Sequence, residues 1–383
     1  MANIVIEGWR FLPHSYSIVN QFQCLELLKR PSVHIFHEDV PFANKNWQFI
    51  NGMFDEKAEI ALQNISKPYF IQPIDAVLRI TSPYNLEASS ALRTCVFGTA
   101  EVGGVTSNML SSNISLREAH SGSDSVIVTP SNWSRLGFIH SGADPSRVVV
   151  VPHGVDPNIY KPLSDEERSE LRSALGWEGF IFLNIGAMTA NKGIGFLLKA
   201  FASVIDKYPE AKLVLKGLDS LYPSKELFIK NVEFLKDFDM EKILHRLIYI
   251  GETMPFSKVA QLYQAADAYV SPYWAEGFNL PVLEAIACGL PVICTKGGAT
   301  DDFTTPNFAL YITSKLQKVK LDEYNTGSVL VPELEHLIEL MTTVIEHQNF
   351  IAQARTNGPK FVATKFTWQL VIDQLLDVLV PSV

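Results

Sequence analysis

Short apolar runs alternate with stretches of helical periodicity along most of the chain. In its first half, such runs predict strands at 3–8, 33–37, 76–80, 94–99, 125–130 and 147–152. In its second half, runs of the same kind predict strands at 180–186, 211–217, 247–252, 268–272 and 291–295. Strands that alternate with helices are typical of parallel sheets covered by helices. The pattern therefore predicts an α/β chain with two Rossmann-like domains.

A polar stretch punctuated by proline separates the two series of strands. After Asp156 the chain reads PNIYKPLSDEERSELRSALG, which predicts a connector and then an amphipathic helix. We therefore expect an N-terminal domain over 1–160 and a C-terminal domain over 161–365. The stretch 366–380 has apolar residues at helical spacing. This C-terminal helix, within 366–383, either caps the second domain or crosses back to the first, because periodicity alone does not decide.

Composition agrees with a folded, soluble protein and narrows its partners. The chain has 383 residues, of which 47% are hydrophobic and 19% charged, values typical of globular proteins. This length favours two domains with a cleft between them. The formal net charge of −9 argues against a nucleic-acid partner, because neutralising phosphates requires a clustered basic surface.

We identify neither a targeting signal nor closely spaced cysteine pairs in the sequence. We find no basic leader and no run near the roughly 18 apolar residues that span a bilayer. We expect a cytoplasmic protein and leave peripheral membrane contact open. Cysteines at 24, 95, 288 and 294 are widely scattered, which favours reduced thiols over disulfides or a zinc site.

The segment 276–292, EGFNLPVLEAIACGLPV, carries the most chemical information in the chain. Pro281 and Gly289 predict a short helix over 281–288, preceded by a loop at the carboxyl end of a strand. A helix start suits a diphosphate, because its N–H groups are free and its dipole is positive. Glu276 can accept hydrogen bonds from hydroxyls and Glu284 can reach a ribose. Alternatively, Glu284 is a surface residue and Glu276 a helix-end charge.

This segment resembles the donor-site signature of GT4-type retaining glycosyltransferases, the glycosyl transferases group 1 family. The shared phrase is Glu-x7-Glu followed by A-x-A-x-G-x-P-V-I. Two further segments are similar to the same family, VVVVPHGVD at 148–156 and NIGAMTANKGIGFLLKAF at 184–201. The resemblance implies a GT-B fold, in which two Rossmann-like domains face each other across a cleft.

The resemblance also implies a reaction. A hexose-type sugar would pass from a nucleotide diphosphate donor, UDP- or GDP-linked, to a hydroxyl of the acceptor with retained configuration. Neither a metal ion nor another cofactor is expected. The acceptor would be a carbohydrate, a lipid-linked molecule or a protein, in glycan or glycoconjugate synthesis.

Roles for individual residues follow from the same resemblance. Lys192 is expected at the donor diphosphate, Glu276 at the sugar hydroxyls and Glu284 at the ribose. The catalytic set that we predict is Glu276 and Lys192, which the resemblance implies, and Glu101, which stands in a loop where the family pattern is absent. The other residues expected at the donor are Gly186, Lys216, Glu252, Met254, Gly277, Phe278, Asn279 and Leu280.

The C-terminal half departs from the family pattern at one position. Ala187 stands where the family usually carries an arginine that faces phosphate. Lys216, at the end of the next predicted strand, is a candidate substitute, or else a lysine in solvent. Asp301 and Asp302 are adjacent and do not form a D-x-D metal motif.

The N-terminal half departs from the pattern at two loops. Ser15 and Tyr16 replace a glycine pair, and His14 and Arg10 are further candidates for the cleft. The family's histidine after the fourth strand is missing. The corresponding loop contains Thr99 and Glu101 instead. We expect the residues on the acceptor side to be His14, Ser15, Tyr16 and Thr99.

Glu101 has two interpretations. It can orient or deprotonate an acceptor hydroxyl, or it can be an ordinary carboxylate at a helix start. Farther along the chain, Ser131 is expected to cap a helix.

Two other functions compete with transfer. The missing arginine and histidine suit a non-catalytic sensor of sugar nucleotides or a partner subunit. An epimerase or a glycosyl phosphorylase would also use such a fold, but the phrase from Glu276 to Glu284 argues against both.

Overall fold

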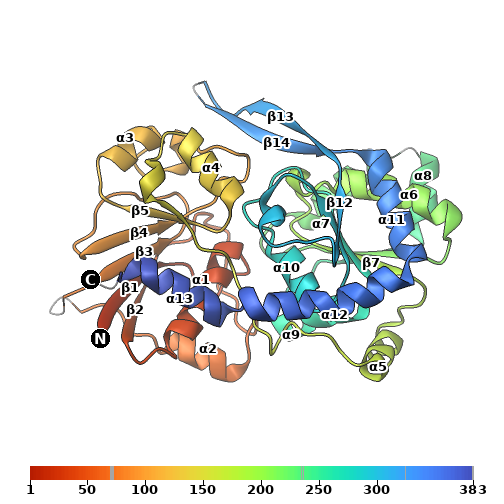
Figure 1. The fold of residues 1–383 in the computed structure, drawn as a ribbon, viewed down its shortest axis with the longest axis horizontal. Helices are drawn as coiled ribbons and strands as arrows, with labels where there is room; N and C mark the ends of the chain where they lie inside the picture. The colour runs from red at the N-terminus through yellow and green to blue at the C-terminus, as the bar shows by residue number, and fades with distance from the viewer. Residues whose placement is uncertain (70–72, 234, 236, 324, 382–383) are drawn as a thin grey trace. The chain divides into compact units, whose positions relative to one another are not determined.

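The computed structural model describes residues 1–69, 73–233, 235, 237–323 and 325–381, and divides into two compact units (Figure 1). The first unit comprises Met1–Gly154, Lys318–Ser328 and the C-terminal stretch from Phe366. The second comprises Val155–Gln317 and Val329–Lys365. Each unit contains a six-stranded sheet, and all the strand pairings described in these two sheets are parallel.

The sheet of the first unit has the strand order β2-β1-β3-β4-β5-β6. Its strands are β1 Ala2–Gly8, β2 Val33–Asp39, β3 Ala76–Ile80, β4 Arg93–Phe97, β5 Val126–Thr129 and β6 Val148–Val150. Its helices are α1 Ser15–Leu27, α2 Glu56–Gln63, α3 Leu116–Ser121 and α4 Asn132–His140, together with the C-terminal α13. The chain reverses its direction across the sheet between β1 and β3. Such a switch point, at the carboxyl ends of the strands, is where open α/β sheets bind ligands.

The C-terminal helix α13, Trp368–Leu379, belongs to the first unit. It packs against α1 and against strands β3 and β4. Trp368 stacks on Phe22 of α1 with ring centroids 5.5 Å apart and an interplanar angle of 9°. Arg30 pairs with Asp373 at 2.9 Å. Of the two placements that periodicity leaves open, the structure has the helix on the N-terminal unit.

The sheet of the second unit has the strand order β12-β11-β10-β7-β8-β9. Its strands are β7 Ile181–Ile185, β8 Lys212–Lys216, β9 Leu247–Ile250, β10 Ala268–Ser271, β11 Val292–Thr295 and β12 Ala309–Ile312. Its helices are α5 Asp165–Leu175, α6 Ile194–Lys207, α7 Ser224–Glu233, α8 Asp237–Leu244, α9 Phe256–Ala265, α10 Leu280–Ala287, α11 Leu334–Glu346 and α12 Gln348–Lys365. Here the order of the strands reverses between β7 and β10, which defines a second switch point.

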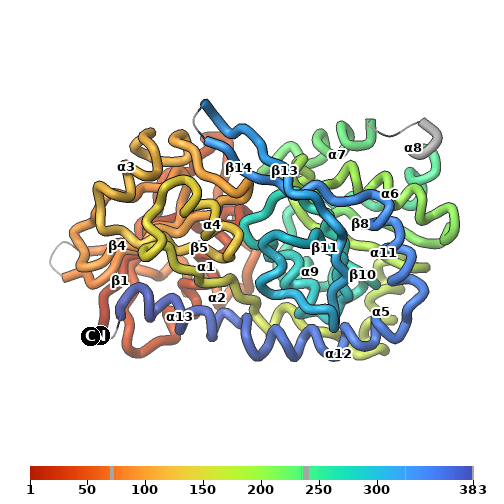
Figure 2. The backbone as a smooth tube through the Cα atoms, turned by 45° about the horizontal axis from the view of Figure 1, so that its top comes forward, coloured from red at the N-terminus to blue at the C-terminus, as the bar shows by residue number. Residues whose placement is uncertain are grey.

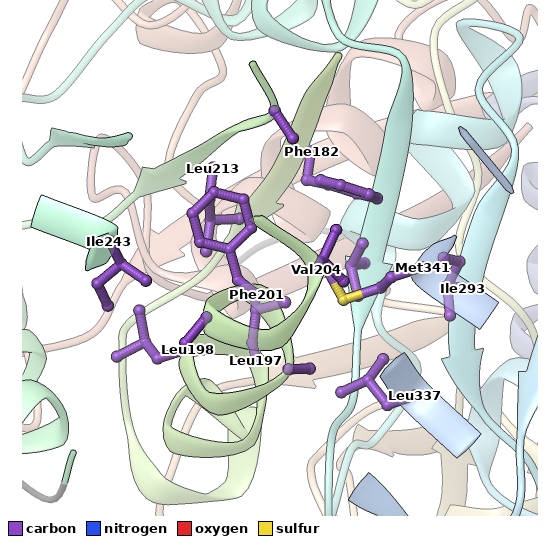
Figure 3. Close-up of a cluster of buried hydrophobic side chains, with 14 of the residues drawn as sticks. Phe182, Leu197, Leu198, Phe201, Val204, Leu213, Ile243, Ile293, Leu337 and Met341 are labelled. Atoms are coloured by element: carbon purple, nitrogen blue, oxygen red, sulfur yellow. The ribbon is translucent and has the colours of Figure 1, made fainter. Parts of the chain in front are cut away.

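One apolar core of the second unit lies between its sheet and helices α6 and α11. Helix α6 buries residues at helical spacing, among them Leu197, Leu198 and Phe201. Figure 3 shows Phe201 next to Leu213 of β8, and Leu337 of α11 belongs to the same buried cluster. Burial of apolar side chains on one helical face is what holds such a helix on a sheet. This core fixes the positions at which β7 and β8 end.

The structure contains a strand at each of the apolar runs that predicted one, and the helix expected over 281–288 is α10. Within the described ranges, three strands were not predicted: β12 and the hairpin of β13 Ser314–Lys320 with β14 Thr326–Pro332. β13 reads SKLQKVK and is mostly exposed, so it has no apolar run. Figures 1 and 2 show β13 and β14 side by side. Among the described residues, no helix is long and apolar enough to cross a bilayer.

Candidate functional site

Two loops of the second unit bring a lysine and a glutamate together at the switch point. Lys192 lies in the loop after β7, and Glu276 lies in the loop after β10. The Nζ atom of Lys192 donates to Oε1 of Glu276 at 2.6 Å. Glu276 is 5% exposed and precedes α10 by several residues, so the alternative of a helix-end charge is wrong. The sequence predicted both residues, and the structure shows that they are in contact.

Asn191 and Gly193 hold these two loops together. Asn191 contacts two residues of the loop after β10. Its backbone carbonyl accepts a hydrogen bond from the N–H of Trp274 at 2.7 Å, and its side-chain Nδ2 donates one to the carbonyl of Ala275 at 3.1 Å. Gly193 has φ +71, and a Cβ there would lie 1.9 Å from the carbonyl oxygen of Pro272. Only glycine fits such an approach. Sequence reasoning missed Asn191, because its partners are distant backbone atoms without a sequence signal.

Asn279 forms the N-terminal end of α10. Its φ of +75 is in the left-handed region, which asparagine tolerates better than most residues. Its Nδ2 donates to Oγ of Ser271 at 2.9 Å, so its side chain is used inside the unit. Phe278 stacks on Phe303 with centroids 4.6 Å apart. The turn therefore presents backbone N–H groups of α10 rather than the Asn279 amide.

Glu284 is buried on α10. It is 7% exposed, so the alternative of a surface residue is wrong. The hydroxyl of Tyr263 donates to its Oε2 at 2.7 Å, and burial raises the pKa of Glu284 to about 7. Burial, and then the charges of Glu276 and Glu284, raise the pKa of Tyr269. The charges of the two glutamates thus act on the same buried tyrosine.

Lys216 ends strand β8, next to β7. It is 4% exposed, and Nζ donates to the carbonyl of Gly217 at 2.5 Å, so the alternative of a lysine in solvent is wrong. Burial lowers the pKa of Lys216 to about 8, although the charges of Glu252 and Asp219 act to raise it. The backbone N–H of Gly186 donates to the carbonyl of Lys216 at 3.0 Å. A buried ammonium group therefore lies at the same sheet edge as Gly186.

The remaining predicted donor residues lie in the same two connections or after β9. Glu252 is exposed and Met254 is half-buried in the loop that follows β9. Gly277 is buried, and Leu280 is half-buried at the first position of α10.

A hydroxyl network joins three strand ends of the first unit. Tyr16 in α1 lies 2.9 Å from the hydroxyl of Tyr84 and 3.1 Å from Oγ1 of Thr99. The Tyr84 hydroxyl donates to the carbonyl of Thr99 at 2.7 Å and accepts from its N–H at 3.1 Å. This network fixes the start of the loop that contains Glu101. Sequence reasoning missed Tyr84, because no motif surrounds it in the loop after β3.

His14 caps helix α1. Its Nδ1 accepts from the N–H of Tyr16 at 3.2 Å, and burial lowers the pKa of His14 to about 4. The ring is therefore neutral at pH 7 and carries its proton on Nε2. Ser15 is exposed beside it. Arg10 differs from our expectation of a cleft residue, because it is buried and its Nη2 and Nε atoms pair with Asp39 at 2.6 and 2.8 Å.

Glu101 lies in an exposed turn, and the indole N–H of Trp133 donates to its carbonyl oxygen at 2.8 Å. No helix begins there, because the next helical segment is a 3-10 turn at Ser107–Met109, so the alternative of a helix-start carboxylate is wrong. As predicted, Ser131 caps α4 by accepting from the N–H of Ser134 at 3.1 Å.

Residues 179–314 match the sequence model of a family described as Glycosyl transferases group 1. This segment is a glycosyl transferases group 1 domain. The match confirms the family resemblance read from the motifs, and it covers Lys192, Glu276 and Glu284.

Curated relatives resemble the group 1 domain and its surroundings. Mannosylfructose-phosphate synthase of Agrobacterium fabrum is 26% identical over 239 residues, which are 61% of this chain and 48% of that protein. D-inositol 3-phosphate glycosyltransferase of Pseudarthrobacter chlorophenolicus is 33% identical over 161 residues, 42% of this chain and 36% of that protein. The chain thus spans half or less of the length of these two relatives.

A solved structure resembles the whole chain. The crystal structure of Anabaena Alr3699/HepE in complex with UDP and glucose has a TM-score of 0.70 at 17% identity, and the match covers 99% of each chain. Identity at this level shows the fold alone. The α/β class with two Rossmann-like units, the GT-B type, is confirmed.

Neither a cluster of metal-binding side chains nor a cysteine pair is found in the described part of the chain. Within the described part of the chain, no group of three or more His, Cys, Asp or Glu is placed to hold a metal ion. Asp301 pairs with Lys296 at 3.0 Å instead. The cysteines at 24, 95, 288 and 294 are free and buried.

Proposed function

We propose that this protein is a retaining glycosyltransferase that moves a hexose-type sugar from a nucleotide diphosphate donor to an acceptor hydroxyl. The observation that carries the proposal is the contact between Lys192 and Glu276 at the switch point of the group 1 domain. A cation for phosphate and a carboxylate for hydroxyls are thereby offered side by side, where such sheets bind ligands.

The donor would be held chiefly by charge and by backbone groups. Lys192 has three donors, so it can keep its bond to Glu276 and also reach the diphosphate. The N–H groups at the start of α10 favour negative charge, and the buried Lys216 replaces the cation missing at Ala187. Glu284 would bind the ribose, and the backbone at Glu252 and Met254 would bind the base.

This set of positive groups supports a reaction that needs no metal ion. As the bond between the anomeric carbon and the phosphate oxygen breaks, negative charge grows on the diphosphate, where fixed positive groups stabilise it most. The acceptor oxygen bonds to the same face of the sugar, and its proton passes to the departing phosphate. UDP- or GDP-linked sugars are the expected donors, and the UDP bound in the HepE structure favours UDP.

The acceptor is assigned to the first unit, where we expect a carbohydrate, a lipid-linked molecule or a protein. Thr99 and Tyr16 fix the loop of Glu101, and His14 and Ser15 lie at the start of α1. The exposed Glu101 would orient the acceptor hydroxyl. Replacing Glu101 with Gln should slow transfer and leave nucleotide affinity unchanged, and an unaltered rate would remove Glu101 from the mechanism.

The decisive test follows release of the nucleoside diphosphate from a panel of sugar nucleotides in the presence of EDTA. We expect release from one donor, a loss of at least 100-fold in Glu276→Ala, and an unchanged rate in Glu335→Ala, which removes an exposed carboxylate of α11. Equal rates in the protein and in Glu276→Ala would refute the proposal, and a requirement for added metal would refute its metal-free form.

A second candidate function is a sensor or partner subunit that binds a sugar nucleotide without turnover. Ala187, in place of an arginine, is the observation that favours it. Tight UDP binding without release from any donor, across a broad acceptor panel, would support the sensor over the transferase.

A further inference from the structure

An aromatic surface of the first unit has no role in the donor chemistry. It consists of Trp47 and Phe49, which lie over Trp9, Phe11 and His14. We propose that this aromatic surface binds a neutral saccharide ring of the acceptor. The inference rests on the proposed function and narrows its acceptor to a carbohydrate.

The outer rings are held by the inner ones. Trp47 makes an edge contact with Trp9 at 5.6 Å between centroids and lies 5.2 Å from His14. Phe49 lies on Phe11 at 4.5 Å. Phe49 is nevertheless 56% exposed, whereas Trp9 and Phe11 are buried. Rigid aromatic side chains provide contact area at a low cost in conformational entropy.

The segment that contains Trp47 and Phe49 is pinned at both ends, although it forms neither helix nor strand. At its start, Val40 N–H donates to the carbonyl of Gly8 at 3.2 Å. At its end, Ile50 N–H donates to the carbonyl of Phe11 at 2.7 Å. Gly8 is the last residue of β1 and Phe11 lies in the connection that follows, at the switch point of the first sheet. The surface therefore borders the position where this sheet is expected to bind a ligand.

Phe11 has an unfavourable backbone conformation that supports this arrangement. Its φ is +55, in the left-handed region that residues with a side chain rarely adopt. Such strain persists only where the surroundings impose it, and it gathers at functional sites. Here the strained residue is buried and carries the ring on which Phe49 lies.

Polar side chains between the rings select the kind of ligand. Asn46 and Gln48 are exposed and flank Trp47, whereas the Oδ1 of Asn44 accepts from the N–H of Asn46 at 2.9 Å. A saccharide offers an apolar C–H face to an aromatic ring and hydroxyls to the neighbouring amides. An acyl or polyprenyl chain would instead bury those amides without partners, which is costly. Lys45 is the one charged residue from 40 to 50, so a neutral ring fits best.

The test measures binding of neutral disaccharides to the full chain saturated with UDP. The probes are maltose, cellobiose, lactose and mannobiose, followed by tryptophan fluorescence and calorimetry. We expect at least one disaccharide to bind and its affinity to fall tenfold or more in Trp47→Ala and Phe49→Ala. Trp47→Phe, which keeps an aromatic face, should retain most of the affinity. Tyr69→Ala removes an exposed aromatic ring elsewhere in this unit and should change nothing.

The inference is overturned if none of these disaccharides binds, or if Trp47→Ala binds as well as the unchanged protein. Binding to phosphatidylglycerol vesicles that depends on Trp47 would also overturn it in favour of a lipid. Each variant is checked for intact UDP affinity and circular dichroism, so misfolding is separated from a lost site. Donor hydrolysis in water reports on the proposed function independently, because it needs no acceptor.

Discussion

At the scale of single residues, the uncharged Asn191 holds the loops of Lys192 and Glu276 in place. Asn191 binds the backbone of Trp274 and Ala275, and so joins two loops that are 84 residues apart in the sequence. A positioning residue of this kind acts on the site through geometry alone. A shift of about 1 Å at such a site costs on the order of 100-fold in rate.

Replacing Asn191 with Ala should weaken donor binding. The variant loses the bond to the carbonyl of Ala275 but keeps the backbone contact with Trp274, so we expect the KM for the donor to rise about tenfold, equal to about 1.4 kcal/mol. Steady-state kinetics with the donor varied would measure this rise. Asn307→Ala changes an exposed asparagine of the same unit and is the control. An unchanged donor KM would show that Glu276 does not depend on Asn191.

The pKa of Lys216 predicts a pH dependence of donor binding. Burial lowers this pKa to about 8, so the ammonium charge is lost as the pH rises from 7 to 9. The KM for the donor should therefore rise over that range. Lys216→Arg keeps its charge and should flatten the profile, whereas Lys216→Met should bind the donor weakly at every pH. A flat profile in the unchanged protein would exclude Lys216 from the proposed donor site.

From the sequence we could single out candidate site residues by the chemistry of their own side chains, but not the residues that position them through backbone atoms. Lys192 and Glu276 belong to the first kind, and Asn191 and Tyr84 to the second. Arg10 was misassigned because its partner Asp39 is 29 residues away. Spacing along the chain does not reveal which charges neutralise each other.

At the scale of elements, the tip of the β13–β14 hairpin meets the loop of Glu101 through backbone contacts. Ser328 N–H donates to the carbonyl of Val102 at 2.7 Å. A Cβ at Gly327 would lie 2.2 Å from the same oxygen, and one at Gly104 would lie 3.1 Å from the carbonyl oxygen of Thr326. The two backbones can approach this closely only without side chains.

Gly327→Ala should separate the hairpin tip from the Glu101 loop. The added methyl group cannot fit at 2.2 Å from the Val102 carbonyl, so we expect faster amide exchange in both segments and little change in overall stability. Hydrogen exchange with mass spectrometry would measure this. Thr326→Ala, at an exposed neighbouring position, is the matched control. Equal protection in both variants would contradict the contact.

Most of the buried strands were predictable from the sequence, with β12 as the exception, and the exposed hairpin was not. The strands from β1 to β11 are short apolar runs, and α10 is bounded by Pro281 and Gly289. β13 alternates basic, amide and apolar residues without burying a face, so nothing in its pattern distinguishes it from a loop. Its pairing with β14 sets its conformation.

At the scale of the whole molecule, three buried histidines and the half-buried His14 should set the stability in acid. Burial lowers the pKa of His14 to about 4 and of His153 to about 3, and it lowers the pKa of His37 and His120. The unfolded chain therefore binds more protons than the folded one below pH 6.5. Stability should be highest above that pH and decline as it falls toward 4.

Between pH 6.5 and 4, each histidine that stays neutral on folding lowers the free energy of unfolding by about 1.4 kcal/mol for each pH unit of acidification. Urea unfolding at a series of pH values from 8 to 5 would measure the slope. His153→Gln should make the slope shallower. A free energy of unfolding that does not change between pH 6.5 and 5 would contradict the burial of these rings as neutral groups.

The position of α13 has a consequence for how the protein is made. The first unit contains both β1 and α13, which follows the second unit in the chain, contacts β3 and β4 and stacks Trp368 on Phe22. A nascent chain on the ribosome therefore completes the contiguous segment 155–317 while α1 still lacks its cover. Until Trp368 has left the exit tunnel, the apolar side of α1 is open to chaperones and proteases, so translation that stops at Lys365 would yield a chain prone to aggregation.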